Sequence, residues 1–437
     1  MIKVSPAKRT VIRLPLYGRV LIGVILGISF GILFKNETYL LGLKNEDLGQ
    51  LGMLVVRLLK ALAIPLILFA ILDAFIRTDI TARHGGRLLL ICLVNALVAM
   101  AIGLIIMNTF EPGKEWSGEL QEMVANLQQS SSLPAIPAEM PQATLNPLKN
   151  LPAYIPESLT EPFLKNNVIT VVLLGLLVGA AVRRVKHLQH AANQNSIAAL
   201  EQGVEAIYQV LIQMLNWVVQ ALPFAVFGVV AHVVGKTGLE LFKLLWIFLA
   251  TIIAGLAIHS LIYYPLLAWW IGKKPPQVYL KGGADAIVTG FSTNSSLATV
   301  PLTLRCLTEN MGVSERPARL SACVGTNLNN DGITLYEAMA ALFLAQATGF
   351  SLDLPQQMVI VLASIMAGVG VAGIPEAGLI VLPLVLGAAG LPEAVVVAAI
   401  PLVMPVDWII ARCRSVVNVL SDMLVAILLD RNLPKVP

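Results

Sequence analysis

The chain has 437 residues, of which 57% are hydrophobic and only 13% are charged, whereas soluble proteins average about 25% charged residues. This composition excludes an ordinary soluble enzyme and predicts an integral membrane protein embedded in a lipid bilayer. The net charge of +4 is small and spread along the chain, so we expect no nucleic-acid partner. The four cysteines stand singly in apolar surroundings, which indicates reduced, packed thiols.

Apolar windows of about 20 residues mark the expected membrane spans. In chain order these windows cover residues 20–34, 54–76, 88–110, 168–182, 207–234 and 241–271. The first window has no convincing cleavage site, so we expect it to remain as a spanning helix. Residues 111–166 contain eight prolines, which predicts a surface loop between the third and fourth spans.

Lysine and arginine set the expected orientation of these spans. They cluster near the N-terminus and within residues 77–87, 183–186 and 273–281. Each cluster follows an even number of expected crossings. The N-terminus is therefore predicted to be cytoplasmic and the proline-rich loop external.

The C-terminal third does not follow the simple pattern of spans. Residues 320–411 contain no lysine or arginine, yet they include the runs GTNLNNDG and GVGVAGIPEAG. Glycine, proline and asparagine at this density break a spanning helix. Irregular backbone at membrane depth occurs only where protein or a water-filled cavity satisfies it. We therefore expect discontinuous helices and re-entrant hairpins around an internal polar site, as in secondary transporters.

Two polar clusters support an internal site. The run STNSSLATVP, residues 292–301, offers hydroxyls and helix N-terminal N–H groups that suit an anion, although a helix cap or a cytoplasmic loop fits equally well. The run GTNLNNDGITLY, residues 325–336, offers amide and carboxylate oxygens of the kind that hard cations bind, a rule we extend to sodium. A polar contact between helices is the alternative, but a carboxylate such as Asp331 needs a partner or a proton there.

A third cluster, ARCRSVVNVLSD, places Arg414, Asn418 and Asp422 four residues apart, on one face of a helix. Arg414 keeps its proton, and its planar fork suits a carboxylate. A salt bridge from Arg414 to Asp407 or Asp331 is the alternative interpretation. The stripe predicts an anionic substrate beside a bound cation.

Together these clusters resemble the dicarboxylate/amino acid:cation symporters, the glutamate transporter family. The turn at Asn329, Asp331 and Gly332 resembles the family's N-M-D-G motif. STNSSLATVP resembles its first hairpin, AGIPEAG the tip of its second hairpin, and VDWIIARCRSVVNVLSD its last helix. The resemblance implies an all-α integral membrane protein with eight transmembrane helices, two re-entrant helical hairpins and inverted repeats, assembled as a homotrimer.

The resemblance also divides the chain into a static scaffold and a moving transport domain. It assigns residues 1–87 to scaffold helices 1 and 2, 88–110 to transport-domain helix 3, 111–166 to the external loop, and 167–237 to scaffold helices 4 and 5. Residues 238–437 would form the rest of the transport domain, from helix 6 through both hairpins to helix 8.

Site residues follow from the same resemblance. Arg414 and Asn418 match residues that bind the substrate's carboxylates, and the second hairpin is expected to act as a gate. The expected substrate site comprises Arg414, Asn418, Ser295, Ser296, Asn327, Ser415, Ala411, Gly373 and Gly378. The expected cation ligands are Gly325, Asn329, Asp331, Asn418, Asp422 and Asn95, with the backbone of residues 368–371 at a third cation site.

Three departures from the family pattern refine these expectations. Ala411 stands where amino acid carriers have an aspartate that binds the substrate's ammonium group. An unpaired, desolvated amine costs several kcal/mol or more, so a C4-dicarboxylate is favoured over glutamate or aspartate. Cys92 and Ala96 replace hydroxyl-bearing residues, so the third sodium site could be lost and Asp331 could bind a proton. Glu376 replaces a small residue and is either a solvated glutamate or a pH-responsive group.

The sequence therefore predicts secondary active symport, with sodium or protons as coupling ions and no other cofactor. The expected location is a bacterial inner membrane, crossed several times, with both termini cytoplasmic. An intramembrane hydrolase using Ser295 or Ser296 would need a general base, but no histidine lies near them in sequence and no Gly-x-Ser-x-Gly elbow occurs. A passive anion channel would leave the cation sites unexplained.

Overall fold

The computed structural model describes residues 16–35, 37–39, 42–77, 82–116, 118, 155–165, 167–191, 196–371 and 376–431. Every regular element within these residues is helical and none is a strand, which confirms the all-α prediction. Most of the predicted proline-rich loop and Gly373 at the second hairpin tip lie outside the described residues.

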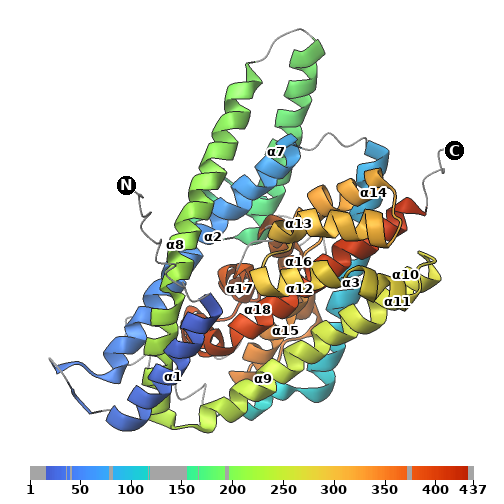
Figure 1. Ribbon diagram of the computed structural model, residues 1–437. Helices are drawn as coiled ribbons and strands as arrows, with labels where there is room; N and C mark the ends of the chain where they lie inside the picture. The colour runs from blue at the N-terminus through green and yellow to red at the C-terminus, as the bar shows by residue number, and fades with distance from the viewer. Residues whose placement is uncertain are drawn as a thin grey trace, which may run out of the picture.

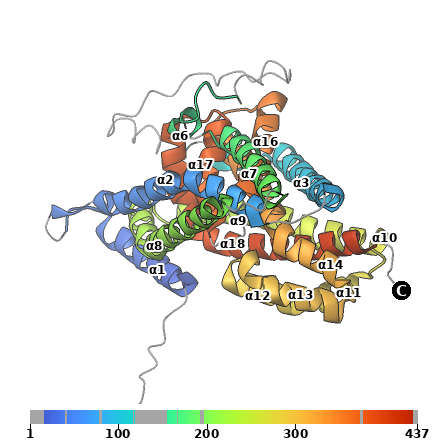
Figure 2. The ribbon, with the colours of Figure 1, turned by 90° about the horizontal axis from the view of Figure 1, so that it is seen from above.

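Four long helices pack together on one side of the molecule (Figures 1 and 2). These are α1 (Leu16–Phe34), α2 (Asn45–Arg77), α7 (Val168–Ala191) and α8 (Ile197–Thr237). Glycines at every fourth position of α1 let it approach α8 closely, because a Cβ added to Gly23 would lie 2.5 Å from the carbonyl oxygen of Pro223. Small residues at helix contacts are typical of membrane proteins, where backbones approach closely.

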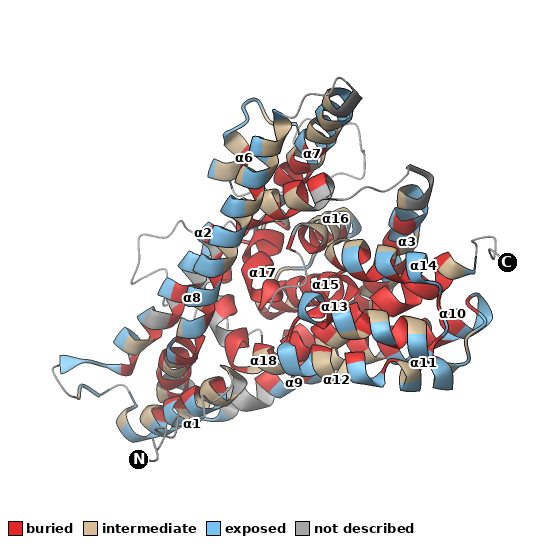
Figure 3. Ribbon diagram, turned by 45° about the horizontal axis from the view of Figure 1, so that its top comes forward, coloured by how far each residue is buried: buried red, intermediate tan, exposed pale blue. Residues whose placement is uncertain are grey.

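The remaining elements, apart from the short α6, which contacts α7, form a second group around the C-terminal helix α18 (Glu393–Asp430). Helix α15 (Asp331–Ala347) and α18 are buried along most of their length (Figure 3). The other elements are α3 (Ala82–Phe110), η2 (Pro112–Trp116), α6 (Glu161–Leu164), α9 (Glu240–Ala257), η3 (Ile258–Tyr263), α10 (Tyr264–Trp270), α11 (Pro276–Gly282), α12 (Ala284–Thr293), α13 (Ser296–Arg305), η4 (Cys306–Asn310), α14 (Glu315–Arg319), η5 (Leu320–Val324), η6 (Gly325–Asn327), α16 (Leu354–Val371) and α17 (Ala377–Ala388).

Two helical hairpins contact α18. Helices α12 and α13 form the first hairpin, and two residues join them. Asn294 takes the left-handed conformation with φ 54°, and the Ser295 hydroxyl accepts the N–H of Ala298 at 3.1 Å, which caps α13. Helices α16 and α17 form the second hairpin, and Glu376 beside its tip is also left-handed, with φ 59°. The run GVGVAGIPEAG thus ends α16 and begins α17, and the run GTNLNNDG lies at the break between η6 and α15.

Within the residues that the structure describes, three helical stretches are long and apolar enough to cross a membrane: Gly85–Phe110, Ile197–Gly235 and Leu245–Trp270. They coincide with the third, fifth and sixth predicted spans. A π-helical turn, η3, interrupts the last of these, and such turns are frequent at functional sites. This turn brings His259, Tyr263 and Tyr264 toward α15, as described below.

Candidate functional site

The Arg414 guanidinium is buried, with 2% of the residue exposed. Its Nη1 and Nη2 atoms donate to the two carboxylate oxygens of Asp407, each at 3.1 Å. The guanidinium carbon also lies 4.1 Å from the ring centroid of Tyr336. The salt bridge to Asp407 that the sequence left as an alternative is therefore present. It uses two of the five guanidinium N–H donors, which leaves three for another partner.

A small cavity lies beside Arg414, between the two hairpins and α18. Its volume of ≈ 10 Å³ is room for about one water molecule. The residues that line it are Asn294, Ile333, Glu376, Ala377, Gly378, Ala411, Arg414, Ser415 and Asn418. Five predicted substrate residues, Arg414, Asn418, Ser415, Ala411 and Gly378, thus meet at one cavity.

Gly378 brings the backbone of α17 against the guanidinium. A Cβ added there would lie 2.0 Å from Nη1 and 2.4 Å from Cζ of Arg414, far inside any normal contact. A Cβ on Gly332 would likewise lie 2.4 Å from the carbonyl oxygen of Arg414. Both glycines are therefore needed for α15 and the second hairpin to close on Arg414.

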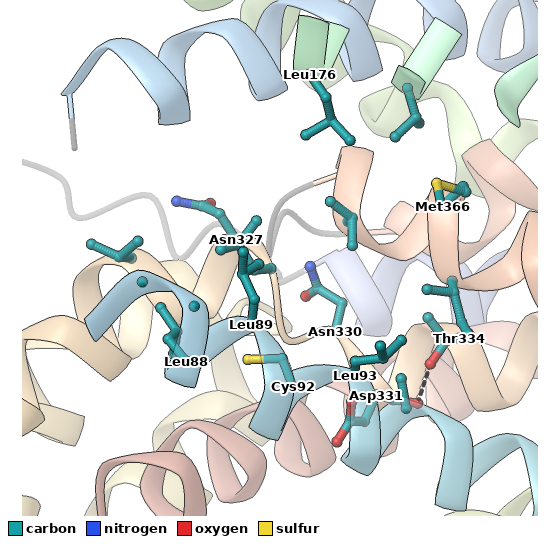
Figure 4. Close-up of a pocket in the computed structure, with 18 of the residues that line it drawn as sticks. Leu88, Leu89, Cys92, Leu93, Leu176, Asn327, Asn330, Asp331, Thr334 and Met366 are labelled. Carbon is teal, nitrogen blue, oxygen red and sulfur yellow. Dashed lines mark hydrogen bonds between the residues drawn. The ribbon is translucent and has the colours of Figure 1, made fainter. Parts of the chain in front are cut away.

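Three other predicted substrate residues do not line this cavity. Ser295 caps α13, and the Ser296 hydroxyl lies 3.3 Å from that of Thr326. Asn327 lines a different and larger cavity (Figure 4). The first hairpin contributes Asn294 to the lining of the Arg414 cavity instead. The sequence analysis did not single out this residue.

Asn418 is held by the protein through both ends of its amide. Its Oδ1 accepts the backbone N–H of Gly332 at 2.8 Å, and its Nδ2 donates to Oδ1 of Asn330 at 3.1 Å. Asn330 in turn donates to the carbonyl oxygen of Gly368 at 2.8 Å. This chain of amides ties α18 to the start of α15 and the end of α16, so Asn418 positions the breaks in these helices.

The carboxylate of Asp331 lies in a buried polar cluster behind the Arg414 cavity. Its Oδ2 accepts the hydroxyls of Tyr264 at 2.8 Å and Ser421 at 2.7 Å, and Nε2 of His259 lies 3.5 Å away. The sequence analysis did not single out these three partners. The only signal for them was a histidine followed by two tyrosines inside an apolar span.

Asn95, a predicted cation ligand, is connected to the same cluster. Its Oδ1 accepts the hydroxyl of Tyr263 at 3.0 Å, and Tyr263 stacks on His259 with ring centroids 5.1 Å apart. Asn95 is therefore linked to Asp331 through Tyr263 and His259.

Among the buried oxygens that have no hydrogen-bond partner within the described residues, two belong to predicted cation ligands. These are Oδ1 of Asn329 and Oδ1 of Asp422. Nδ2 of Asn329 already donates to Ser421 at 2.7 Å, so its free Oδ1 can only accept. Buried acceptors normally have a donor or an ion, and oxygens of this kind suit a hard cation. The carbonyl oxygen of Gly325, another predicted ligand, accepts the N–H groups of Leu328 and Asn329.

The larger cavity, of ≈ 560 Å³, lies between α7 of the first helix group and α3, α15 and α16 of the second. Figure 4 shows Leu88, Leu89 and Leu93 on one side and Leu176 on another, so its lining is largely apolar. Asn330 and Asp331 reach one wall of it. The cavity thus lies between a helix that the family resemblance assigns to the scaffold, α7, and helices that it assigns to the transport domain.

Comparison with known proteins assigns this arrangement to a family. The model of the sodium:dicarboxylate symporter family matches residues 16–432. The chain belongs to that family. It is 27% identical to human excitatory amino acid transporter 3, across 91% of this chain and 82% of the human protein. It is 29% identical to an excitatory amino acid transporter of Caenorhabditis elegans, across 91% of this chain and 84% of the worm protein.

Family membership confirms the predicted resemblance and the general activity of this symporter. Sodium-coupled secondary transport and a membrane location follow from the family and from the apolar helices. The family consists of transporters rather than enzymes, in agreement with the expectation drawn from the sequence.

Proposed function

We propose that this symporter carries a small dicarboxylate on Arg414, coupled to sodium, protons or both. The observation that carries the proposal is a buried guanidinium with three unused N–H donors beside a cavity bounded by both hairpins and α18. A carboxylate that reaches this cavity would replace water with a charge-assisted, bidentate contact.

The cation sites that we propose are centred on two carboxylates. The first is at Asp422 and Asn329. Oδ1 of each residue has no hydrogen-bond partner among the described residues and can bind a positive ion. The second is at Asp331, which is buried and whose Oδ2 has Tyr264, Ser421 and His259 near it among the described residues. Bound cations would neutralise both carboxylates, so the loaded protein would expose less unpaired charge to apolar surroundings as it moves.

The pair between Arg414 and Asp407 fits a transport cycle as well. A carrier must return without substrate, and an unpaired guanidinium in an apolar environment is costly. Asp407 neutralises Arg414 when the site holds no anion, while the remaining donors are still available to one. An internal salt bridge is therefore compatible with a binding role for Arg414.

The proposed movement is of the elevator type, within a homotrimer. Residues 88–110 and 238–437 would move as the transport domain, and residues 1–87 and 167–237 would remain as the scaffold. The large cavity between α7 and the helices α3, α15 and α16 supports this division, because it lies along the boundary between the two proposed parts.

The substrate class contains two candidates. Ala411 favours a C4-dicarboxylate, since the last helix offers no carboxylate for an amine at that position. The named relatives are excitatory amino acid transporters, which favours an acidic amino acid. Glu376 lines the same cavity as Ala411, so the loss of one carboxylate does not leave the cavity without another.

Uptake into liposomes tests the proposal. Purified protein should accumulate at least one of labelled succinate, malate, aspartate and glutamate under an imposed sodium or pH gradient. Arg414→Ala should abolish uptake, whereas Arg319→Ala, which removes an exposed arginine paired with Glu315, should not. Uptake that ignores both gradients would indicate a passive channel and contradict symport.

A further inference from the structure

The tip of the second hairpin carries a carboxyl group that the proposed transport cycle does not use. Glu376 directly precedes α17, lines the Arg414 cavity and is 4% exposed. Its backbone is left-handed, with φ 59°, a conformation that non-glycine residues adopt uncommonly. The second hairpin therefore holds this side chain inside the protein although its backbone is strained there.

Glu376 is the point where the two hairpins meet over the last helix. Nδ2 of Asn294, at the tip of the first hairpin, donates to Oε1 of Glu376 at 2.9 Å. Oδ1 of the same Asn294 accepts the hydroxyl of Ser415 on α18 at 3.1 Å. The carboxyl of Glu376 also forms a hydrogen bond with the carboxyl of Asp407 on α18. One carboxyl group thus joins the second hairpin to both the first hairpin and α18.

A hydrogen bond between two carboxyl groups requires a proton on one of them, because an ionised carboxylate only accepts. Both oxygens of Asp407 already accept from the guanidinium of Arg414, each at 3.1 Å, and this bidentate pair favours the ionised form of Asp407. The proton therefore belongs to Glu376. In the closed site Glu376 donates to Asp407 while its Oε1 accepts the N–H of Asn294.

The charges around Glu376 lead to the same protonation state. Glu376 faces Asp407, Arg414 and Arg412 of α18, and Glu337 of α15 also faces Arg414. Arg414 forms its salt bridge with Asp407, and Arg412 donates to a backbone carbonyl oxygen one turn earlier on its own helix. The first hairpin presents a neutral amide. A further ionised carboxylate buried here would be repelled by the first.

We propose that Glu376 is a proton-binding site of this symporter, protonated while both hairpins close on α18 and ionised once the second hairpin opens. This inference rests on the proposed function, because it takes the second hairpin as the gate of the Arg414 site and a proton as one coupling ion. On opening, the O–H bond of Glu376 breaks and the proton passes to water that enters the cavity, which leaves a carboxylate. Closing reverses this step.

The direction of the pH dependence follows from this cycle. A glutamate in water is ionised above about pH 4.3, so at neutral pH the opened Glu376 must take up a proton before the hairpins close. Each pH unit above this titration lowers the protonated fraction about tenfold. Transport should therefore be favoured at acidic pH, and each closure should carry a proton together with the substrate.

Sodium-driven uptake of labelled succinate and labelled aspartate into liposomes tests this proton site, over a series of pH values that are equal on both sides. Wild-type uptake should fall about tenfold for each pH unit on the alkaline side of its optimum, and a pH-sensitive dye in the lumen should record acidification with uptake. Glu376→Gln still accepts from Asn294 but binds no proton. Its uptake should become constant across the pH series, and the acidification per transported substrate should disappear.

Two other glutamates serve as controls. Glu309→Gln removes an exposed carboxylate on η4 and should keep the wild-type pH profile. Glu337 is fully buried, and neither of its carboxyl oxygens has a hydrogen-bond partner among the described residues, so it is the competing location for a proton. A pH dependence that survives Glu376→Gln and disappears in Glu337→Gln would overturn the inference.

Infrared spectroscopy examines the proton without transport. At neutral pH the wild-type protein should show the C=O stretching band of a protonated carboxylic acid that Glu376→Gln lacks, and a difference spectrum without this band would contradict the inference. Arg414-dependent, sodium-driven uptake with neither pH dependence nor proton movement would remove Glu376 alone from the mechanism. A wild-type protein that moves neither substrate under any gradient would overturn the proposed function, and the infrared band would still decide whether Glu376 holds a proton.

Discussion

A single methyl group at Gly378 tests whether the second hairpin closes on Arg414. In Gly378→Ala the new carbon would lie 2.0 Å from Nη1, 2.4 Å from Cζ and 2.8 Å from Nη2 of Arg414. Non-bonded carbon atoms pack best at about 3.5–4.0 Å, so the guanidinium or α17 must move by roughly 1.5 Å. The hydrogen bonds to Asp407 measure 3.1 Å, and a shift of this size breaks them.

The cost of that shift can be estimated from the pair it disrupts. Removing one partner of a buried ion pair costs about 3–5 kcal/mol, and a displacement that keeps both partners costs less. Each 1.4 kcal/mol corresponds to about tenfold in an equilibrium constant. If the same displacement misplaces Arg414 for its substrate, the half-saturating dicarboxylate concentration should rise at least about tenfold. Protein melting in detergent should also shift downward.

The matched control lies on the same helix. A Cβ on Gly387 would meet nothing within 4 Å, so Gly387→Ala should leave uptake unchanged. Both variants are assayed for uptake of labelled dicarboxylate in liposomes at equal protein content. If Gly378→Ala transports with wild-type half-saturation, Arg414 does not bind substrate in the place described here.

Three further substitutions examine other parts of the account. Asp407→Asn leaves the buried guanidinium without its counter-charge and should destabilise the protein by about 3–5 kcal/mol, and a thermal melt identical to that of the wild type would argue against the pair. Asp331→Asn keeps the hydrogen-bond acceptor but removes the charge, so the sodium concentration for half-maximal uptake should rise about tenfold or more; an unchanged sodium dependence would exclude Asp331 as a cation site. Gly228→Ala would place a methyl carbon 2.0 Å from a carbonyl oxygen of α2, so it should lower the melting temperature without altering substrate affinity. Gly203→Ala, on the same helix as Gly228 and with no neighbour within 4 Å, should change neither the melting temperature nor the substrate affinity.

Local patterns in the sequence predicted the helical class and much of the cavity on α18. Residues 411, 414, 415 and 418 lie within about two helical turns, so helical periodicity alone brings them to one face. Asp407, seven residues before Arg414, shares that face as well. Periodicity could not decide whether Arg414 binds Asp407 or a ligand, because Asp407 takes two of the five guanidinium N–H donors and leaves the others available.

Contacts between distant segments could not be read from the sequence. Asn294 and Glu376 are 82 residues apart and meet only because both hairpins fold against α18. Tyr264 reaches Asp331 across 67 residues through a π-helical turn that no composition rule predicts. The family resemblance placed Ser295, Ser296 and Asn327 at the substrate. None of the three lines the Arg414 cavity, where Asn294 is the residue from the first hairpin.

The most direct test of the central claim is accumulation of labelled dicarboxylate against its own concentration gradient, in liposomes containing wild-type protein or Arg414→Ala. The account predicts that an inward sodium or proton gradient drives the internal concentration of at least one dicarboxylate above the external one for the wild type, and that this accumulation vanishes in the variant. Equal accumulation by both proteins, or mere equilibration by the wild type under either gradient, would contradict cation-coupled transport on Arg414.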